Sequence, residues 1–329
     1  MVTLFGIITL TLLAVSALAT VQARNLFVSV MWFGIFSLLM ASNFFILDAA
    51  DVALTEAAVG AGVSTVLFLS ALALTAEHER GEALMRWLPI AVLGVASLLL
   101  FVATFQQPVL GDPQAPVHTH VAPWYLSETP TLIDIPNVVA AVLASFRGYD
   151  TLGEVIVVFA AGIGVLSVLG FRPKKRDRAT GEEVAQKVRT LQHHSILRVV
   201  GKLIIPFLLL FALAVQFHGE YTPGGGFPAG ALFCSAVMLY AMLEGADRSA
   251  RVMPQRVMLI LGALGATLFT GVGVVCMLLG GHFLEYNVLG AYPVAGQHLG
   301  IILVEFGVGL TVAAVLIAIF NAMANRETY

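Results

Sequence analysis

Apolar residues in this chain gather in long segments that recur along its whole length. Nine of these segments are long enough to cross ~30 Å of hydrocarbon as α-helices. They cover residues 2–21, 27–47, 52–75, 87–105, 149–170, 199–217, 227–243, 257–280 and 298–322. The pattern therefore predicts an all-α, polytopic membrane protein with about nine transmembrane helices.

Composition supports this class. Hydrophobic residues make up 59% of the chain and charged residues only 11%, a balance outside the range of soluble globular domains. The first apolar segment contains Ser16-Ala-Leu-Ala19, which looks like a signal-peptide cleavage site. No basic residue precedes its apolar core, so we expect this segment to stay in the protein as a transmembrane helix.

Basic residues predict the orientation of these helices. When the connections are assigned alternately to two sides, all 17 Lys and Arg residues except Arg147 fall on one side. Basic residues mark the cytoplasmic side of a membrane, so the N-terminus is predicted outside and the C-terminus in the cytoplasm. The acidic residues of the outer side or outer helix halves are Asp48, Asp51, Glu56, Asp112, Glu128, Asp134, Asp150, Glu154, Glu220, Glu285 and Glu305. An acidic outer surface concentrates cations, although positive-inside sorting alone also leaves acids there.

The longest polar cytoplasmic stretch divides the chain. We predict a five-span region at 1–171, a basic linker at 172–197 and a four-span domain at 198–329. The basic run could contact anionic membrane lipid, or it could be a solvated linker. The outer connection at 106–147 is predicted to be a loop with a short surface helix over 135–146.

Several function classes lack support. Cys234 and Cys276 sit within apolar segments without a Cys-x-x-Cys pattern, so we expect them to be packing residues rather than metal ligands. The chain contains no phosphate-binding loop, dinucleotide fingerprint or nucleophile motif. The sequence thus predicts no enzyme active site, no cofactor, no metal site and no nucleic-acid binding.

Carboxylates inside apolar segments are the main candidates for chemistry. A bare carboxylate in hydrocarbon costs at least ~2.5–3.5 kcal/mol, so each is expected to be paired or to carry a proton or cation. Asp48 and Asp51 lie at the outer rim of the third segment, and Glu56 lies ~7.5 Å deeper. Gly60 and Ser64 follow Glu56 on the same helix face, where glycine permits close helix approach or an irregular backbone ladder.

The fifth and ninth segments each add one intramembrane acid. Arg147 and Asp150 are predicted to form an ion pair near the interface, and Glu154 lies one turn deeper. Glu305 lies ~10 Å inside the ninth segment, on the same face as His298.

The placement of these acids predicts half of an ion path. Glu56, Glu154 and Glu305 share a similar depth, so they could line one outward-facing half-channel if their helices pack together. The inner halves of the segments carry no comparable acid, so partner subunits are expected to supply the inner half. At the inner edge, Lys202 is expected to extend toward water and Glu244 to be solvated.

A glycine-rich turn joins the sixth and seventh segments. It reads His218-Gly-Glu220-Tyr-Thr-Pro223-Gly224-Gly225-Gly226-Phe227. Glycines after a proline allow backbone conformations closed to other residues, so the turn is predicted to tuck into the membrane face and pack on a neighbour. The alternative is an ordinary tight hairpin between two helices.

These residues resemble a known family. The turn, followed by Gly230, is similar to the B-type subunit of the Mrp-type multisubunit cation/proton antiporters over about 195–325. The front half is similar to the C-terminal region of the large A-type subunit, through residues 48–60, Asn137-Val-Val and Phe146–Glu154. Corresponding small subunits occur in membrane-bound hydrogenases.

The resemblance implies a function. It places the chain in a bacterial cytoplasmic membrane with other antiporter subunits, Na⁺ or K⁺, and H⁺ as partners. Glu154 falls on a glutamate of the family's ion path, and Asp51 and Glu56 fall on its acidic motif. Glu305 is a further candidate from the residues alone. The predicted supporting residues are Arg147, Asp150, His218, Glu220 and His298.

Two alternatives remain open from the sequence. The chain could belong to the membrane arm of a redox complex such as an energy-converting hydrogenase, in which the same ion modules are coupled to electron transfer. It could also be a structural scaffold whose acids are paired within the fold.

Overall fold

The computed structural model describes residues 2–72, 75, 78, 87–109, 111–169 and 195–324. Most of the linker predicted at 172–197 lies outside these residues, as do Arg80, Arg86 and Arg326. Within them, nine helices are long and apolar enough to cross a membrane, which confirms the predicted fold class. They are α1 (Val2–Gln22), α2 (Leu26–Ile46), a composite of α3 (Ala50–Glu56), η1 (Ala57–Ser64) and α4 (Thr65–Leu72), α5 (Trp87–Thr104), α9 (Gly148–Leu169), α11 (Ser195–Phe217), α12 (Gly226–Glu244), α14 (Gln255–Leu278) and α15 (Pro293–Ala324).

The outer connection contains more helix than the sequence predicted. Besides α8 (Val138–Ala141) and η2 (Val142–Phe146), it forms α6 (Pro116–Thr119) and α7 (Val121–Leu132). Trp124 and Tyr125 of α7 both contact Phe146, the first edge-to-face and the second tilted, with ring-centroid distances of 5.2 and 5.3 Å. These aromatic contacts hold α7 in place, a tertiary effect that the proline-rich sequence did not reveal. Two further short helices are α13 (Ala246–Val252) and η4 (Tyr286–Leu289).

The third span is not a regular α-helix. Its middle section, η1, is wound as a π-helix that begins directly after Glu56 and contains Gly60 and Gly62. The sequence allowed for such an irregularity at the glycines. A Cβ on Gly60 would lie 2.8 Å from the hydroxyl oxygen of Ser37 on α2 and would also meet the Glu56 carboxylate, so only glycine fits between them. Wide turns of this kind occur often at functional sites.

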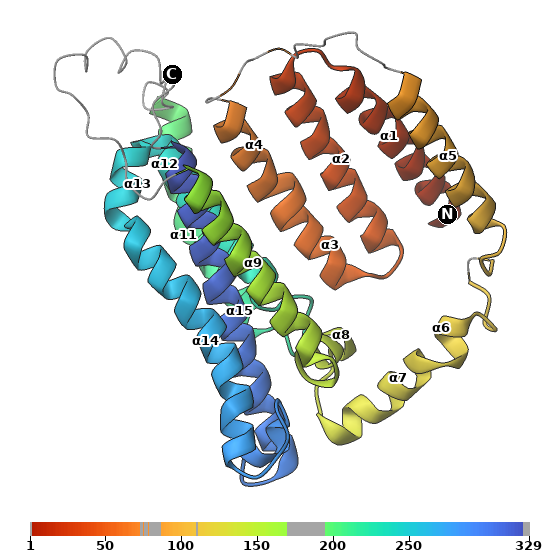
Figure 1. The fold of residues 1–329 in the computed structure, drawn as a ribbon, viewed down its shortest axis with the longest axis vertical. Helices are drawn as coiled ribbons and strands as arrows, with labels where there is room; N and C mark the ends of the chain where they lie inside the picture. The colour runs from red at the N-terminus through yellow and green to blue at the C-terminus, as the bar shows by residue number, and fades with distance from the viewer. Residues whose placement is uncertain are drawn as a thin grey trace.

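Helix α15 is the central element of the rear half of the chain, residues 198–329. It packs against α12 and α14 and also against α9 of the front half (Figure 1). Glycines allow the closest contacts: a Cβ on Gly307 would lie 2.8 Å from the carbonyl oxygen of Gly265. The hydroxyl of Thr311 donates to the carbonyl of Gly262 across the same interface at 3.1 Å. Small residues and side-chain hydrogen bonds are how helices associate where lipid removes the hydrophobic drive.

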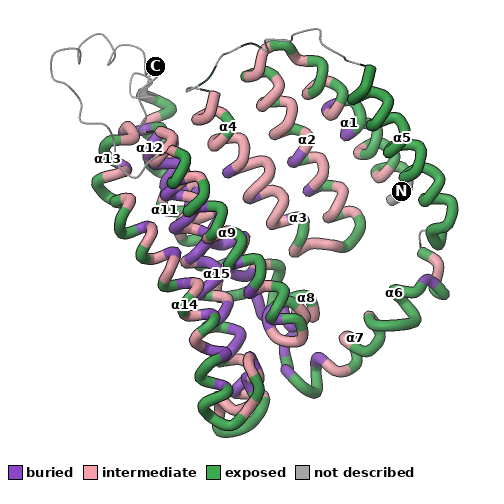
Figure 2. The backbone as a smooth tube through the Cα atoms, viewed as in Figure 1, coloured by how far each residue is buried: buried purple, intermediate pink, exposed green. Residues whose placement is uncertain are grey.

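The third span packs against the rear half of the chain, as α9 does. Ala58 and Val63 of η1 are buried in one hydrophobic cluster with residues of α12 and α15, including Cys234. Cys276 is buried in the second cluster, so both cysteines are packing residues, as predicted. Buried residues concentrate on α12 and α15, whereas α5 is exposed along its whole length (Figure 2).

The connections sort to two ends of the helices (Figure 1). Residues 47–49, 111–137, 218–225 and 279–292 lie at one end, which we name the predicted outer end. Helix α13 and the C-terminal end of α15 lie at the opposite end, the predicted inner end. The two sides assigned from the charges thus correspond to two ends of one helical assembly, while their in-or-out orientation stays a prediction.

Gly230→Val is expected to destabilise the contact between α12 and α15. Its Cβ would lie 2.7 Å from the carbonyl oxygen of Gly309 and 2.9 Å from Cβ of Val312. Overpacking of this kind costs ~1–3 kcal/mol, so the melting temperature of the purified protein should fall. Gly164→Val is the matched control, because no atom lies within 4 Å of a Cβ at this position on α9. Equal melting temperatures for the two variants would show that the α12–α15 contact accommodates the larger side chain without loss of stability.

Candidate ion site at the predicted outer end

The glycine-rich turn, residues 218–225, forms what we name the outer loop. Gly225 has φ +109°, a conformation that side-chain-bearing residues rarely adopt, and its N–H donates to the carbonyl of Val215 at 3.1 Å. At the start of α12, a Cβ on Gly226 would overlap the backbone of Glu305 and lie 2.8 Å from the nitrogen of Gly309. The outer loop therefore packs directly on the backbone of α15, as the sequence predicted for the turn.

Asp51 and Asn137 connect three parts of the chain at the outer loop. The Asn137 side-chain amide donates to Oδ1 of Asp51 at 3.1 Å and to the carbonyl of Gly219 at 2.9 Å. Its Oδ1 accepts from Val139 N, which caps α8. Gly224 N also donates to Oδ1 of Asp51, at 3.1 Å. Asp51 of the front half is thus held by two donors from the outer connection and the outer loop.

The Glu305 carboxylate accepts a hydrogen bond from the first backbone N–H of α12. Gly226 N donates to Oε2 of Glu305, and a Cβ on Gly225 would lie 2.8 Å from the same oxygen. Glu305 occupies the thirteenth position of α15, ~18 Å from the start of that helix. The outer loop therefore reaches well below the end of the α14–α15 hairpin to meet this carboxylate.

A second acid lies beside Glu305. Glu220 is only 9% exposed, and its Oε2 lies 2.9 Å from Nδ1 of His298. Its other oxygen, Oε1, is buried and has no hydrogen-bond partner among the described residues. Glu220 and Glu305 line the same cavity of about 40 Å³, together with Ala140, Gln216, Phe217, Gly219, Ile301 and Ile302. The cavity has room for a water molecule or a small cation.

The remaining predicted residues lie outside this cavity. Glu56 is half-buried beside Gly60 and has no hydrogen-bond partner within the described ranges. Asp48 is exposed, with φ +58°, in the turn before α3. His218 is exposed, and its Nδ1 lies 3.1 Å from the carbonyl oxygen of Ala214. Pro223 is exposed in the outer loop.

Helix α9 carries its acids on a surface of the molecule. Arg147 and Asp150 form the predicted ion pair at 2.5 Å, and both side chains are more than half exposed. Glu154 is exposed as well, while Leu152 and Val155 face the core. The chain alone therefore does not bring Glu154 to the cavity of Glu220 and Glu305, because the packing of α9 turns it outward.

Asn137 is the residue whose role the sequence did not reveal. Its position between Pro136 and the apolar run of α8 is a usual N-cap signal. The contact with Asp51 carries no such signal, because 86 residues separate the two positions. Only the folded chain shows that one side chain both caps α8 and binds the acid of the front half.

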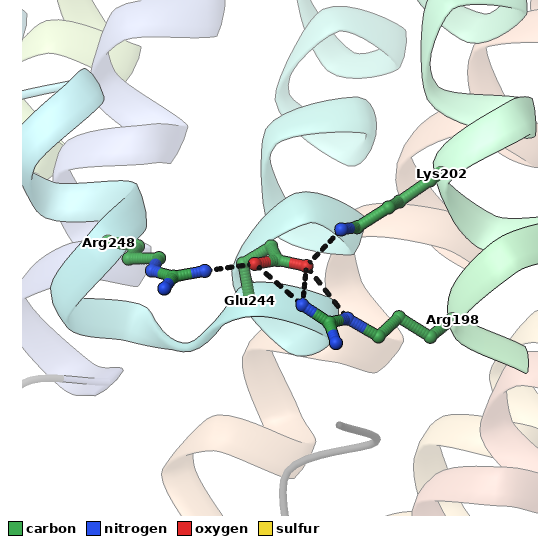
Figure 3. Close-up of polar contacts among 4 residues, drawn as sticks. All are labelled: Arg198, Lys202, Glu244 and Arg248. Atoms are coloured by element: carbon green, nitrogen blue, oxygen red, sulfur yellow. Dashed lines mark hydrogen bonds and ion pairs between the residues drawn. The ribbon is translucent and has the colours of Figure 1, made fainter. Parts of the chain in front are cut away.

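The predicted inner end differs from expectation. Glu244 was expected to be solvated, but its side chain is only 5% exposed and binds Arg198, Lys202 and Arg248 (Figure 3). Lys202 was expected to extend toward water; its side chain is about half exposed, and its Nζ also lies 2.7 Å from Oε1 of Glu244. The reason is tertiary: α11 brings Arg198 and Lys202 to the last residue of α12, a contact that spans 46 residues in the case of Arg198.

Family models match three parts of the chain. Residues 196–318 match a domain related to the MnhB subunit of Na⁺/H⁺ antiporters. Residues 11–77 match the model of the D-type subunit of MBH, and residues 88–186 match that of its E-type subunit.

Relatives agree with these matches. A putative antiporter subunit of Staphylococcus aureus, mnhB2, is 31% identical over 138 residues, which are 40% of this chain and 96% of that protein. A probable K⁺/H⁺ antiporter protein of Rhizobium meliloti, of the combined A/B type, is 28% identical over 221 residues, 58% of this chain. The aligned part is only 21% of that longer protein.

Two solved structures are similar. A chain of the Mrp complex from Dietzia sp. DQ12-45-1b superposes with a TM-score of 0.77 at 25% identity, covering 96% of this chain and 34% of that chain. A chain of an archaeal membrane-bound sulfane sulfur reductase gives 0.54 at 26% identity, covering 72% of this chain and 99% of that chain.

Asn137→Asp tests the contact between Asn137 and Asp51. Aspartate still caps α8, but it replaces the amide donor by a second carboxylate facing Asp51. The variant should lose the ~1.5–3 kcal/mol of a hydrogen bond to a charged group at neutral pH. Because acid protonates one of the two carboxylates and restores a donor, the loss should shrink at acidic pH in thermal melts.

Asn25→Asp is the control for this prediction. Asn25 caps α2 by accepting from Val28 N at 3.2 Å, and no carboxylate contact of its side chain is found in the described chain. The control should keep its melting temperature at both pH values. If the two variants behaved alike, the contact with Asp51 would not matter for stability.

Proposed function

The chain belongs to the family of MnhB-type Na⁺/H⁺ antiporter subunits, and on that premise we propose that it forms the outer part of a monovalent cation/proton path. The single observation that carries the proposal is the cavity shared by Glu220 and Glu305. It lies at the end of the molecule to which the sequence assigns the outside.

The energetics of the carboxylates support the proposal. Asp51 accepts two hydrogen bonds, worth ~1.5–3 kcal/mol each, which together offset the ~2.5–3.5 kcal/mol cost of a charge among apolar helices. Glu305 accepts one, from Gly226, so its charge is compensated at best in part. A carboxylate in that condition takes up a proton or a small cation readily. Glu305 is therefore the exchange group, and Asp51 is a hydrogen-bonded acid beside the outer loop.

Glu56 and Glu154 extend the path in two directions. Glu56 ends α3 directly before the π-helical section of the third span, and its carboxylate lies beside Gly60, near Ser37 of α2. Glu154 faces away from the rear half, where an exposed intramembrane acid is costly unless another protein covers it. We assign Glu154 to the interface with a partner in the antiporter complex, together with the Arg147–Asp150 pair. Asp48 and His218 lie exposed at the same end of the molecule and are the candidates for first contact with the ion.

The complete transporter requires further subunits. The described helices place no comparable set of acids at the inner half of the membrane, and the buried carboxylate there, Glu244, is bound by three cations. Regions 1–171 and 198–329 then act as fused A-type and B-type parts. The transported ions are H⁺ and either Na⁺ or K⁺, and the setting is a bacterial cytoplasmic membrane.

A second candidate function has an observation of its own. The match to the D-type and E-type proteins of MBH and the likeness to a chain of the archaeal sulfane sulfur reductase favour a place in the membrane arm of a redox complex. Purification in mild detergent separates the two. Co-purifying iron–sulfur proteins would support the redox complex, and further antiporter subunits alone would support the antiporter.

Glu305→Gln is expected to reduce cation-dependent proton movement in everted vesicles to below about a tenth of the unmodified rate. Glutamine keeps the acceptor for Gly226 N but cannot exchange a proton for a cation. Glu285→Gln is the control, because Glu285 lies in the α14–α15 turn and contacts His282. Unchanged transport by Glu305→Gln in an assembled complex would favour the structural scaffold instead.

Glu154→Gln tests whether the acid at the proposed partner interface is needed for transport in addition to the acids of the cavity. We expect loss of antiport with the complex still assembled, measured by vesicle transport and by co-purification of the partner proteins. Asp150→Asn, which removes only the ion pair with Arg147, should act more weakly because that pair is exposed. Full activity of Glu154→Gln would exclude Glu154 from the path.

A further inference from the structure

Three cations surround one carboxylate at the predicted inner end, and we name Arg198, Lys202, Arg248 and Glu244 the inner basic cluster (Figure 3). Arg198 binds Glu244 through Nε at 3.0 Å and through Nη2 at 2.9 Å. Lys202 and Arg248 approach Glu244 from α11 and α13. One buried carboxylate thus neutralises one of three positive charges.

The surplus charge faces the surroundings. The side chains of Arg198, Lys202 and Arg248 are 38%, 48% and 56% exposed, whereas Glu244 is 5% exposed. Within the described ranges these three side chains hydrogen-bond only to Glu244, which leaves N–H groups on each of them free for another acceptor. Counting Asp247 and Arg251 of α13 as well, four basic residues stand against two acidic ones.

An apolar face continues from the cluster along α11. Ile196, Val199 and Leu203 are 78%, 70% and 64% exposed, and they lie on the same first turns as Arg198 and Lys202. Charged groups at a helix end next to an exposed apolar face match the two parts of a phospholipid, a headgroup and an acyl chain. Basic pockets between helices on the cytoplasmic side bind anionic headgroups for this reason.

We propose that the inner basic cluster binds the phosphate headgroup of an anionic phospholipid, with an acyl chain along the exposed face of α11. Glu244 holds Arg198 and Lys202 in place for the headgroup and limits their affinity for it. The site lies at the opposite end from the carboxylates of the predicted outer end. Whether a lipid occupies it, next to α11, α12 and α13, depends on how much anionic phospholipid the membrane contains.

The test uses the detergent-solubilised complex. Phosphatidylglycerol or phosphatidylcholine is titrated in, and bound lipid is counted by native mass spectrometry. We expect the complex to retain phosphatidylglycerol in preference to phosphatidylcholine. Lys202→Gln and Arg248→Gln should each lower its affinity about fivefold, the effect of one basic residue near a charged surface. Both leave Glu244 with its bidentate contact to Arg198, so the fold should persist.

Arg256→Gln is the matched control. It removes one positive charge from the same end, at an exposed position in the first turn of α14 that lies outside the cluster. Equal lipid affinities for the control and the cluster variants would overturn the proposal. So would displacement of the lipid by an equal concentration of inorganic phosphate, because the site would then recognise a free anion.

Glu244→Gln distinguishes lipid binding from a purely structural ion pair. Removal of the competing carboxylate should raise the affinity for phosphatidylglycerol severalfold while lowering the melting temperature. A structural ion pair predicts only the lower melting temperature. Cross-linking of the cluster to acidic residues of a partner protein, with no lipid retained, would assign the surface to that protein and contradict the proposal.

Discussion

Two backbone amides at the glycine-rich loop hold the outer end of the protein together. Gly224 N donates to Asp51 of the front half, and Gly226 N donates to Glu305 in the centre of the rear half. Backbone groups at membrane depth must be satisfied by protein, and carboxylates there need donors. The loop meets both needs in one arrangement, and only glycine allows it to approach α15 closely enough.

The buried acids at the two ends of the molecule have partners of different charge. At the predicted outer end, neutral amides donate to Asp51 and Glu305, and one oxygen of Glu220 has no hydrogen-bond partner among the described residues, so negative charge remains available to an ion. At the predicted inner end, cations overcompensate Glu244, so positive charge remains available to an anion. The proposed outer path for a cation and the proposed inner site for an anionic lipid both rest on this asymmetry.

Exposed surfaces explain why the chain acts with partners. Helix α5 has no buried residue, and Glu154 faces outward from α9. Lipid can cover the apolar surface of α5, but a carboxylate such as Glu154 gains from a protein neighbour with donors or water. The solved complex with the similar chain is an Mrp complex, which fits an ion path completed between several proteins.

The sequence by itself determined the class of fold, the number of spans and the sorting of charge to two ends, because burial of apolar segments and exclusion of charge from hydrocarbon are local costs. It also named Asp51, Glu305 and the glycine-rich turn as candidates. Only the tertiary structure decided which acids meet. His298 reaches Glu220 across 78 residues, Glu154 turns outward, and Glu244 is enclosed by cations. In a helix that is apolar on every side, lipid and protein interior look alike, so no polar stripe shows which face will be buried.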